Sequence, residues 1–186
     1  MYNREFTPEK IISLEPNEIF VFGSNLAGSH GGGAARIAYN SFGAIWGQGV
    51  GFQGQSYAIP TMQGGVETIK PYVDEFLAFA KQHSKMKFYV TRIGCGIAGF
   101  KDEDMAPLFS EAFDIENVIL PRSFVGIIST GMRYADEMST MAFKIKKIKF
   151  YDEDLAYFES LSSHEEKMEF MRRLRQEKRY IELDDE

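Results

Sequence analysis

Short runs of apolar residues alternate, along the N-terminal part of the chain, with segments whose apolar residues recur every three or four positions. Continuous apolar runs of this length are typical of strands that are buried on both faces. The sequence predicts such strands at 19–22, 56–60, 88–91 and 117–121. Helical spacing occurs at 34–41, at 69–80, where Pro71 is expected to open the helix, and in a helix that begins at 102 and carries Met105, Leu108, Phe109 and Ala112 on one face. This alternation predicts an α/β fold with a largely parallel sheet covered on both faces.

The pattern changes after Phe124. Lys144–Lys149 is a basic, partly alternating stretch, which predicts an exposed edge strand whose lysines discourage the addition of further strands. Ser163 followed by Glu166 has the spacing of a capping box and predicts the start of a helix. An acidic tail at 184–186 follows that helix.

Composition agrees with one core domain and an extension. A chain of 186 residues that is 44% hydrophobic can bury one core. We expect this domain at 1–125 and a mostly helical extension at 126–186, packed on the core or on a second subunit, through which an oligomer can form. The net charge of −6 argues against general binding of polyanions.

The cellular location also follows from composition. Cys95 is the only cysteine, which excludes an internal disulfide and fits a reducing compartment. No apolar run approaches the ~18 residues that span a bilayer, so no membrane partner is expected. No cluster of Cys, His and Asp has the spacing of metal ligands. We therefore expect a cytoplasmic protein with neither a metal nor a cofactor.

Two glycine-rich segments carry the candidate chemistry. Ser29–Ala35 and Arg92–Phe100 each lie between a predicted strand and a predicted helix. Glycine allows positive φ and close approach of a ligand, and the first amides of the following helix lack intrahelical partners. Two such segments in one chain predict a ligand with two phosphates. The alternative is that both are only tight turns.

The second glycine-rich segment is also compatible with a dinucleotide-binding fold. Gly94-x-Gly96-x-x-Gly99 matches the glycine fingerprint that follows a strand and opens a helix. That fold needs an acidic residue at the end of the next strand to bind a ribose, but this strand ends in Pro121-Arg122. A nicotinamide-dependent oxidoreductase of the Rossmann kind is therefore the third hypothesis.

The arrangement as a whole resembles a macrodomain, the fold that binds ADP-ribose. The resemblance covers about residues 15–124 and is carried by Phe22-Gly23-Ser24-Asn25 at a strand end, by Gly31-Gly32-Gly33-Ala34-Ala35 opening a helix, and by Gly94-Cys95-Gly96-Ile97-Ala98-Gly99-Phe100 before another. It implies a three-layer α/β/α sandwich with a mixed, largely parallel sheet. It also implies a surface cleft that holds the diphosphate of ADP-ribose between the two glycine loops.

The same resemblance assigns candidate roles. Asn25 is similar to the asparagine beside the distal ribose, and Phe100 to the aromatic residue beside a ribose. The loop amides and the strand end are expected to bind the ligand through Gly23, Ser24, Gly31, Gly32, Gly33, Ala34, Gly94, Cys95, Gly96, Ile97, Ala98 and Gly99. The expected partners are ADP-ribose and ADP-ribosylated protein or nucleic acid.

Two activities remain open within this resemblance. The chain is most similar to the branch that removes ADP-ribose from carboxylate side chains or DNA bases, with hydrolysis at the distal ribose. Where that branch carries a lysine and, in part, an aspartate, this chain has Met62 and Ala98. His30 is the candidate substitute, acting with Asn25 to position water or the leaving group. The other hypothesis is a binding module without turnover.

Four further side chains have alternative interpretations. Cys95 lies before a predicted helix, whose N-terminus could lower the pKa of its thiol, or the tight loop simply requires a small side chain. Gln48, Gln53 and Gln55 either contact the adenine or ribose of a ligand or are solvated loop residues.

Overall fold

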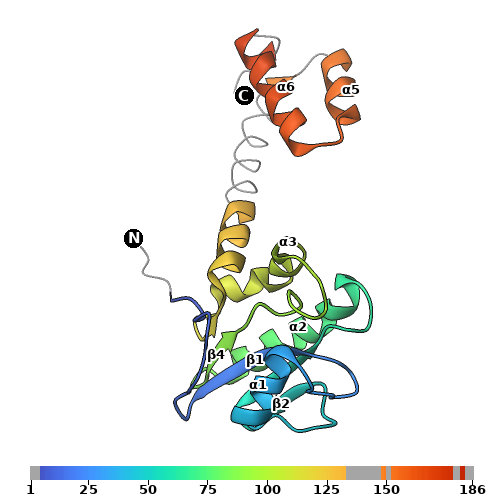
Figure 1. The fold of residues 1–186 in the computed structure, drawn as a ribbon. Helices are drawn as coiled ribbons and strands as arrows, with labels where there is room; N and C mark the ends of the chain where they lie inside the picture. Colours follow the sequence, from blue (N-terminus) through green and yellow to red (C-terminus); the bar gives the residue numbers. More distant parts are fainter. Residues whose placement is uncertain (1–4, 133–147, 150–151, 178–180, 183–186) are drawn as a thin grey trace. The chain divides into compact units, whose positions relative to one another are not determined.

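A computed structural model describes residues 5–132, 148–149, 152–177 and 181–182, which form two compact units (Figure 1). The first unit comprises Met1–Gly131 and the second Met132–Glu186. The expected boundary at residue 125 falls within a helix that begins at residue 122 and is described as far as residue 132. The core domain therefore extends a few residues further than its sequence pattern predicts.

A five-stranded sheet forms the centre of the first unit. Its strands are β1 (Glu18–Ser24), β2 (Gly51–Gln53), β3 (Ser56–Pro60), β4 (Lys87–Val90) and β5 (Val118–Ile119), in the order β2-β3-β1-β4-β5. β1 pairs in parallel with β3 and β4, β4 pairs in parallel with β5, and only β2 is antiparallel. The expected mixed, largely parallel sheet is confirmed. The carboxyl ends of β1, β3 and β4 consequently meet at one edge.

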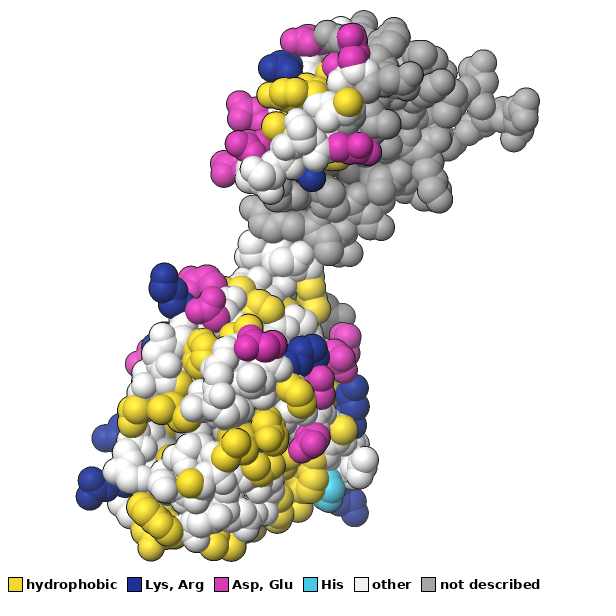
Figure 2. All heavy atoms as spheres, turned by 90° about the vertical axis from the view of Figure 1, so that its right-hand side faces the viewer, with side chains coloured by type: hydrophobic (Ala, Val, Ile, Leu, Met, Phe, Trp, Pro, Cys, Tyr) yellow, Lys and Arg dark blue, Asp and Glu magenta, His cyan; other side chains and the backbone are white. Residues whose placement is uncertain are grey.

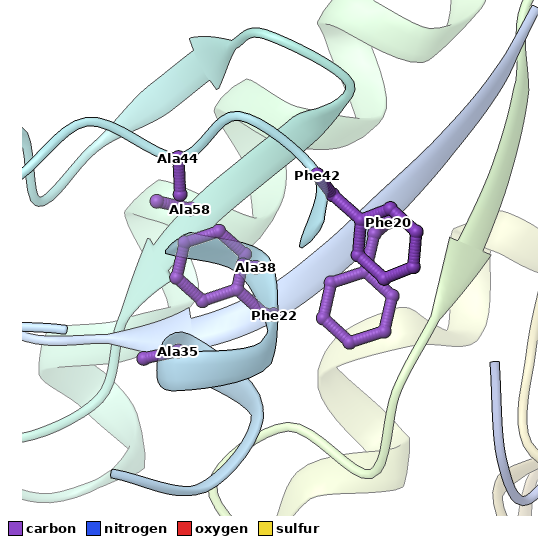
Figure 3. Packing of buried hydrophobic residues seen from close by; sticks show 7 residues of the cluster. All are labelled: Phe20, Phe22, Ala35, Ala38, Phe42, Ala44 and Ala58. Carbon is purple, nitrogen blue, oxygen red and sulfur yellow. The ribbon is translucent and has the colours of Figure 1, made fainter. Parts of the chain in front are cut away.

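Helix α1 (Gly33–Ser41) covers one face of the sheet. Figure 3 shows its two buried alanines, Ala35 and Ala38, near the ring of Phe22 of β1. The buried cluster comprises Phe20, Phe22, Ala35, Ala38, Phe42, Ala44 and Ala58. Because alanine is small, the helix backbone lies close to the strand, and the aromatic rings fill the remaining space.

Helix α2 (Val66–Gln82) covers the opposite face. Its buried stripe is Ile69, Val73, Phe76, Leu77 and Ala80, as the spacing predicts. The Phe76 ring contacts Tyr57 of β3 at 5.0 Å and Phe88 of β4 at 5.6 Å between centroids. Helices on both faces establish an α/β sandwich.

Two helix boundaries differ from expectation. Pro71 lies inside α2 and does not open it, because the helix already begins at Val66 after an extended Gly65. The helix expected from 102 begins there, but it is divided into α3 (Asp102–Met105) and a 3₁₀ helix, η1 (Ala106–Asp114). Of its expected apolar face, Met105, Phe109 and Ala112 are buried, and Leu108 is half-buried.

The second unit is mostly helical in its described residues. It contains α5 (Asp152–Ser160), α6 (His164–Gln176) and a short antiparallel pair, β6 (Ile148–Lys149) with β7 (Ile181–Glu182). The predicted capping box is confirmed: the Ser163 amide donates to Glu166 and the Glu166 amide donates to Ser163 Oγ, both at 3.1 Å. Residues 144–147 of the expected edge strand and the acidic tail lie outside the described residues.

Hydrophobic side chains also reach the surface of the first unit, and Figure 2 shows several grouped on one side of the molecule. The large hydrophobic residues of this unit whose side chains are exposed are Ile12, Leu26, Ile37, Tyr39, Ile45, Trp46, Phe52, Met62 and Ile97. Within the described part of the chain, no helix combines the length and apolarity needed to cross a membrane.

Candidate functional site

The two glycine-rich segments line one pocket of about 400 Å³ at the carboxyl edge of the sheet. The loop after β1, the turn after β3 and the loop after β4 all contribute to its wall. The lining residues are Gly23, Ser24, Asn25, Ser29, Gly31, Gly32, Gly33, Ala34, Ala35, Trp46, Thr61, Met62, Thr91, Arg92, Ile93, Gly94, Gly96, Ile97 and Ala98. Parallel strands bring these loops together because their carboxyl ends share an edge, which is where open α/β sheets bind ligands.

The start of α1 supplies one set of hydrogen-bond donors. The first amide of this helix with an intrahelical acceptor is that of Arg36, which donates to the carbonyl of Gly32 at 3.1 Å. The amides of Gly33, Ala34 and Ala35 therefore have no backbone acceptor among the described residues. Gly33 adopts a φ of +55°, a conformation that favours glycine. The helix dipole adds partial positive charge at this end.

The loop after β4 supplies a second set. The amides of Gly96, Ile97 and Ala98 have no acceptor within the described part of the chain. The other half of the loop folds back on itself, since the amides of Cys95, Gly99 and Phe100 donate to carbonyls of the same segment, at 3.0–3.1 Å. These bonds fix the shape of the loop and leave the amides of Gly96, Ile97 and Ala98 without a protein acceptor, so that they can bind a ligand.

Three of the expected ligand-binding residues do not line this pocket. Cys95, Gly99 and Phe100 are absent from its wall. The Phe100 ring lies beneath the loop, since a Cβ placed on Gly94 would be 3.2 Å from its Cδ2 atom. The residue is half-buried, and its amide donates to the Gly94 carbonyl at 3.0 Å. The contact expected between this ring and a ribose is therefore not supported by the pocket wall.

Asn25 lines the pocket but its amide also has a local role. Its Nδ2 donates to the Ser29 carbonyl at 2.9 Å, and its Oδ1 accepts from the Ser29 amide at 3.0 Å. One N–H and one lone pair of this side chain remain for a ligand. Nearby, the Ser24 hydroxyl donates to the Gly49 carbonyl, so this serine supports the loop.

His30 lies outside the pocket. It is 1% exposed, and its Nε2 is 3.0 Å from the Ile45 carbonyl oxygen and 3.2 Å from that of Gln48. Two acceptors at this distance require Nε2 to carry a proton. The catalytic role expected for His30 is therefore not supported, because the imidazole bonds to a neighbouring loop and does not face the ligand space.

Among the described residues that line the pocket, Arg92 is the only ionisable one. Its Nε and Nη2 donate to Asp102 Oδ1 at 3.1 and 2.8 Å. Burial opposes ionisation of Asp102, but the hydrogen bonds and charge of Arg92 outweigh it, and the pKa of this carboxyl is lowered. Asp102 itself does not line the pocket. The one formal charge in the described wall is therefore the Arg92 guanidinium, which is paired with Asp102 and has further N–H groups for an anionic ligand.

Cys95 is not an activated nucleophile. Burial, together with the nearby carboxylate of Asp102, raises the pKa of its thiol to about 12. A thiolate is the reactive form of cysteine, and this environment suppresses it. The interpretation that a small side chain was required here is the better one.

Sequence reasoning missed several wall residues. Thr61 follows β3, and Trp46 lies in the loop between α1 and β2. The parallel arrangement of β1, β3 and β4 was the available signal for Thr61, whose neighbour Met62 the resemblance already placed at the site. No periodic pattern marks Trp46. Among the described residues, no group of three or more His, Cys, Asp or Glu side chains could hold a metal ion.

Comparison with known proteins adds no further assignment. No protein-family model, curated protein or solved structure matches this chain.

Proposed function

We propose that the first unit binds ADP-ribose, free or attached to another molecule. One observation carries this proposal: two sets of amides without acceptors, at Gly33–Ala35 and at Gly96–Ala98, line the same pocket. A diphosphate presents oxygens in two directions, and amides on two walls satisfy both. The guanidinium of Arg92 adds a cation to the same wall.

An adjoining groove accommodates the rest of such a ligand. Ala34, Thr91 and Arg92 line both the pocket and a groove of about 1580 Å³ whose other walls include residues 5–12. A nucleotide whose diphosphate occupies the pocket can extend its adenosine into this groove. This continuity favours a long ligand with a central diphosphate over inorganic phosphate.

The pocket wall favours binding without turnover. Among the described residues, the wall of this pocket contains no Asp, Glu, His, Lys, Cys or Tyr side chain. Hydrolysis of a glycosidic bond ordinarily uses a proton donor or acceptor within hydrogen-bond reach. Met62 and Ala98, which stand where the hydrolytic branch has its lysine and aspartate, both lie in this wall. We therefore propose a binding module without turnover as the first candidate and a hydrolase as the second.

An oxidoreductase receives less support. The segment Gly94-x-Gly96-x-x-Gly99 leads into α3, which has only four residues. The dinucleotide fingerprint depends on a longer helix whose N-terminus faces the pyrophosphate.

Calorimetry with ADP-ribose, ADP and ribose 5-phosphate tests the proposal. We expect ADP-ribose to bind with a Kd of roughly 1–100 µM, corresponding to about −5.5 to −8 kcal/mol, and the two fragments to bind more weakly. The absence of heat at millimolar ADP-ribose would contradict the proposal. Incubation with ADP-ribosylated protein and DNA then separates the two activities, because release of free ADP-ribose would identify a hydrolase.

A further inference from the structure

Trp46 stands at the wall of the pocket with its ring accessible. It is the only tryptophan in the chain, and it is 56% exposed although it lines the pocket. Its ring makes edge-type contacts with Tyr39, at 5.7 Å between centroids, and with His30, at 6.4 Å. A large aromatic surface next to a ligand space is an established means of binding a planar ring.

The loop that carries Trp46 is fixed by two buried polar side chains. His30 bonds to the carbonyls of Ile45 and Gln48, on either side of Trp46. Gln53, which is 3% exposed, accepts from the Ile45 amide at 2.6 Å and donates to the Gln48 carbonyl at 3.1 Å. Buried polar groups are costly unless paired, so these bonds hold the loop in one conformation. Trp46 is therefore positioned before any ligand arrives.

The position of Trp46 relates it to one end of the ligand. The adjoining groove shares Ala34, Thr91 and Arg92 with the pocket, but Trp46 does not line that groove. If adenosine extends into the groove, Trp46 lines the space left for the rest of the ligand, which includes the distal ribose and its attached group. The exposed side chains of Met62 and Ile97 also line the pocket, so its wall carries further apolar surface besides Trp46.

We propose that Trp46 is a specificity-determining residue that stacks on a planar heteroaromatic ring attached to the distal ribose of the bound ADP-ribosyl group. The inference rests on the proposed function and names the class of adduct that the site prefers. A wall with exposed apolar side chains and an aromatic platform suits a ring, such as nicotinamide or a nucleobase, better than an ADP-ribosylated glutamate, because the ester of that adduct presents no planar ring on which Trp46 can stack.

The single tryptophan makes this proposal directly measurable. Intrinsic fluorescence of the full chain is titrated with four probes: free ADP-ribose, NAD, single-stranded DNA carrying ADP-ribose on a base, and a peptide carrying ADP-ribose on glutamate. We expect at least one ring-bearing probe to quench Trp46 and to bind at least fivefold more tightly than the glutamate probe. Quenching by NAD alone identifies a pyridine ring, and quenching by DNA alone identifies a nucleobase.

Substitution of Trp46 separates stacking from general packing. Calorimetry is used because the variants lack the fluorophore. Trp46→Leu should weaken the preferred ring-bearing probe at least fivefold and free ADP-ribose less than twofold, while Trp46→Phe should retain most of the affinity. Phe52→Leu is the matched control, since Phe52 is an exposed aromatic residue outside the pocket wall. Equal weakening of all probes, or none, would overturn the inference.

His30 acts on the ligand only through this loop and is a positioning residue. His30→Leu should lower the preference for the ring-bearing probe over free ADP-ribose, and His30→Gln, which restores an N–H near the Nε2 position, should recover it. A preference unchanged in folded His30→Leu would contradict this role. Failure of every probe to bind the wild-type chain would instead overturn the proposed function, and this inference with it.

Discussion

Asn25 and Ser29 are joined by two hydrogen bonds, one from the Asn25 side chain to the Ser29 carbonyl and one from the Ser29 amide back to the same side chain. The pair closes the turn that leads to Gly31–Gly33 and the start of α1. Asn25 thereby positions the glycine loop while it also faces the pocket. Its two tasks can be separated by substitution.

Asn25→Asp is expected to reduce ADP-ribose affinity at least tenfold. The carboxylate still accepts from the Ser29 amide. It also adds a negative charge to the pocket wall, where Arg92 is the only ionisable side chain among the described residues, and this charge repels an anionic ligand. The free energy of unfolding should fall by only about 1 kcal/mol, because one hydrogen bond is lost. Asn17→Asp is the matched control, since Asn17 is exposed and outside the pocket. Equal affinities in the two variants, measured by calorimetry, would contradict the assignment.

Arg92→Ala should affect binding more than stability. The Arg92–Asp102 ion pair joins an arginine side chain that is 62% exposed to an aspartate side chain that is 14% exposed. Solvent screening on the arginine side limits its contribution to folding to about 1 kcal/mol. Loss of the guanidinium should weaken ADP-ribose binding about 5- to 20-fold and reduce its dependence on salt.

Lys70→Ala provides the control for that experiment, because Lys70 pairs with Asp74 at 2.7 Å on α2 and lies outside the pocket wall. Thermal unfolding and calorimetry of both variants give the comparison. A variant of Arg92 that binds like the Lys70 variant would show that the guanidinium does not contact the ligand.

Alkylation of Cys95 should have an unusual pH profile. With a pKa raised to about 12, the thiol is protonated in the folded state throughout the neutral range, so the thiolate fraction rises about tenfold with each pH unit up to pH 10. An ordinary thiol, with a pKa near 8.5, approaches full ionisation by about pH 9.5. The rate of reaction with iodoacetamide, followed by mass spectrometry, should therefore still rise steeply between pH 9 and pH 10. A plateau above pH 9 would contradict the raised pKa.

Local patterns predicted the elements of the fold well because they depend on neighbouring residues. The apolar run 19–22 marks β1 because a central parallel strand is buried on both faces. Gly31–Gly33 and Gly94–Gly99 mark turns because several of these glycines adopt positive φ. The small residues Ala35 and Ala38 fit the helix expected over the sheet.

The side chains that complete the pocket were less predictable because distant segments place them. His30 lies in the expected loop, but its direction is set by carbonyls of Ile45 and Gln48. Trp46 joins the wall because Gln53 and His30 hold its loop, and no local signal records that arrangement. The Phe100 ring lies close to Gly94, a contact that the glycine pattern alone does not indicate.

Calorimetric titration of ADP-ribose into Gly96→Val tests the central claim most directly. Gly96 lines the pocket, and a Cβ there meets no protein atom within 4 Å, so the added side chain occupies ligand space without straining the fold. Gly126→Val is the matched control, because its Cβ is equally unobstructed and the residue lies outside the pocket. We expect the wild-type chain and Gly126→Val to bind alike and Gly96→Val to bind at least tenfold more weakly at unchanged melting temperature. Undiminished binding by Gly96→Val would contradict a diphosphate site between the two loops.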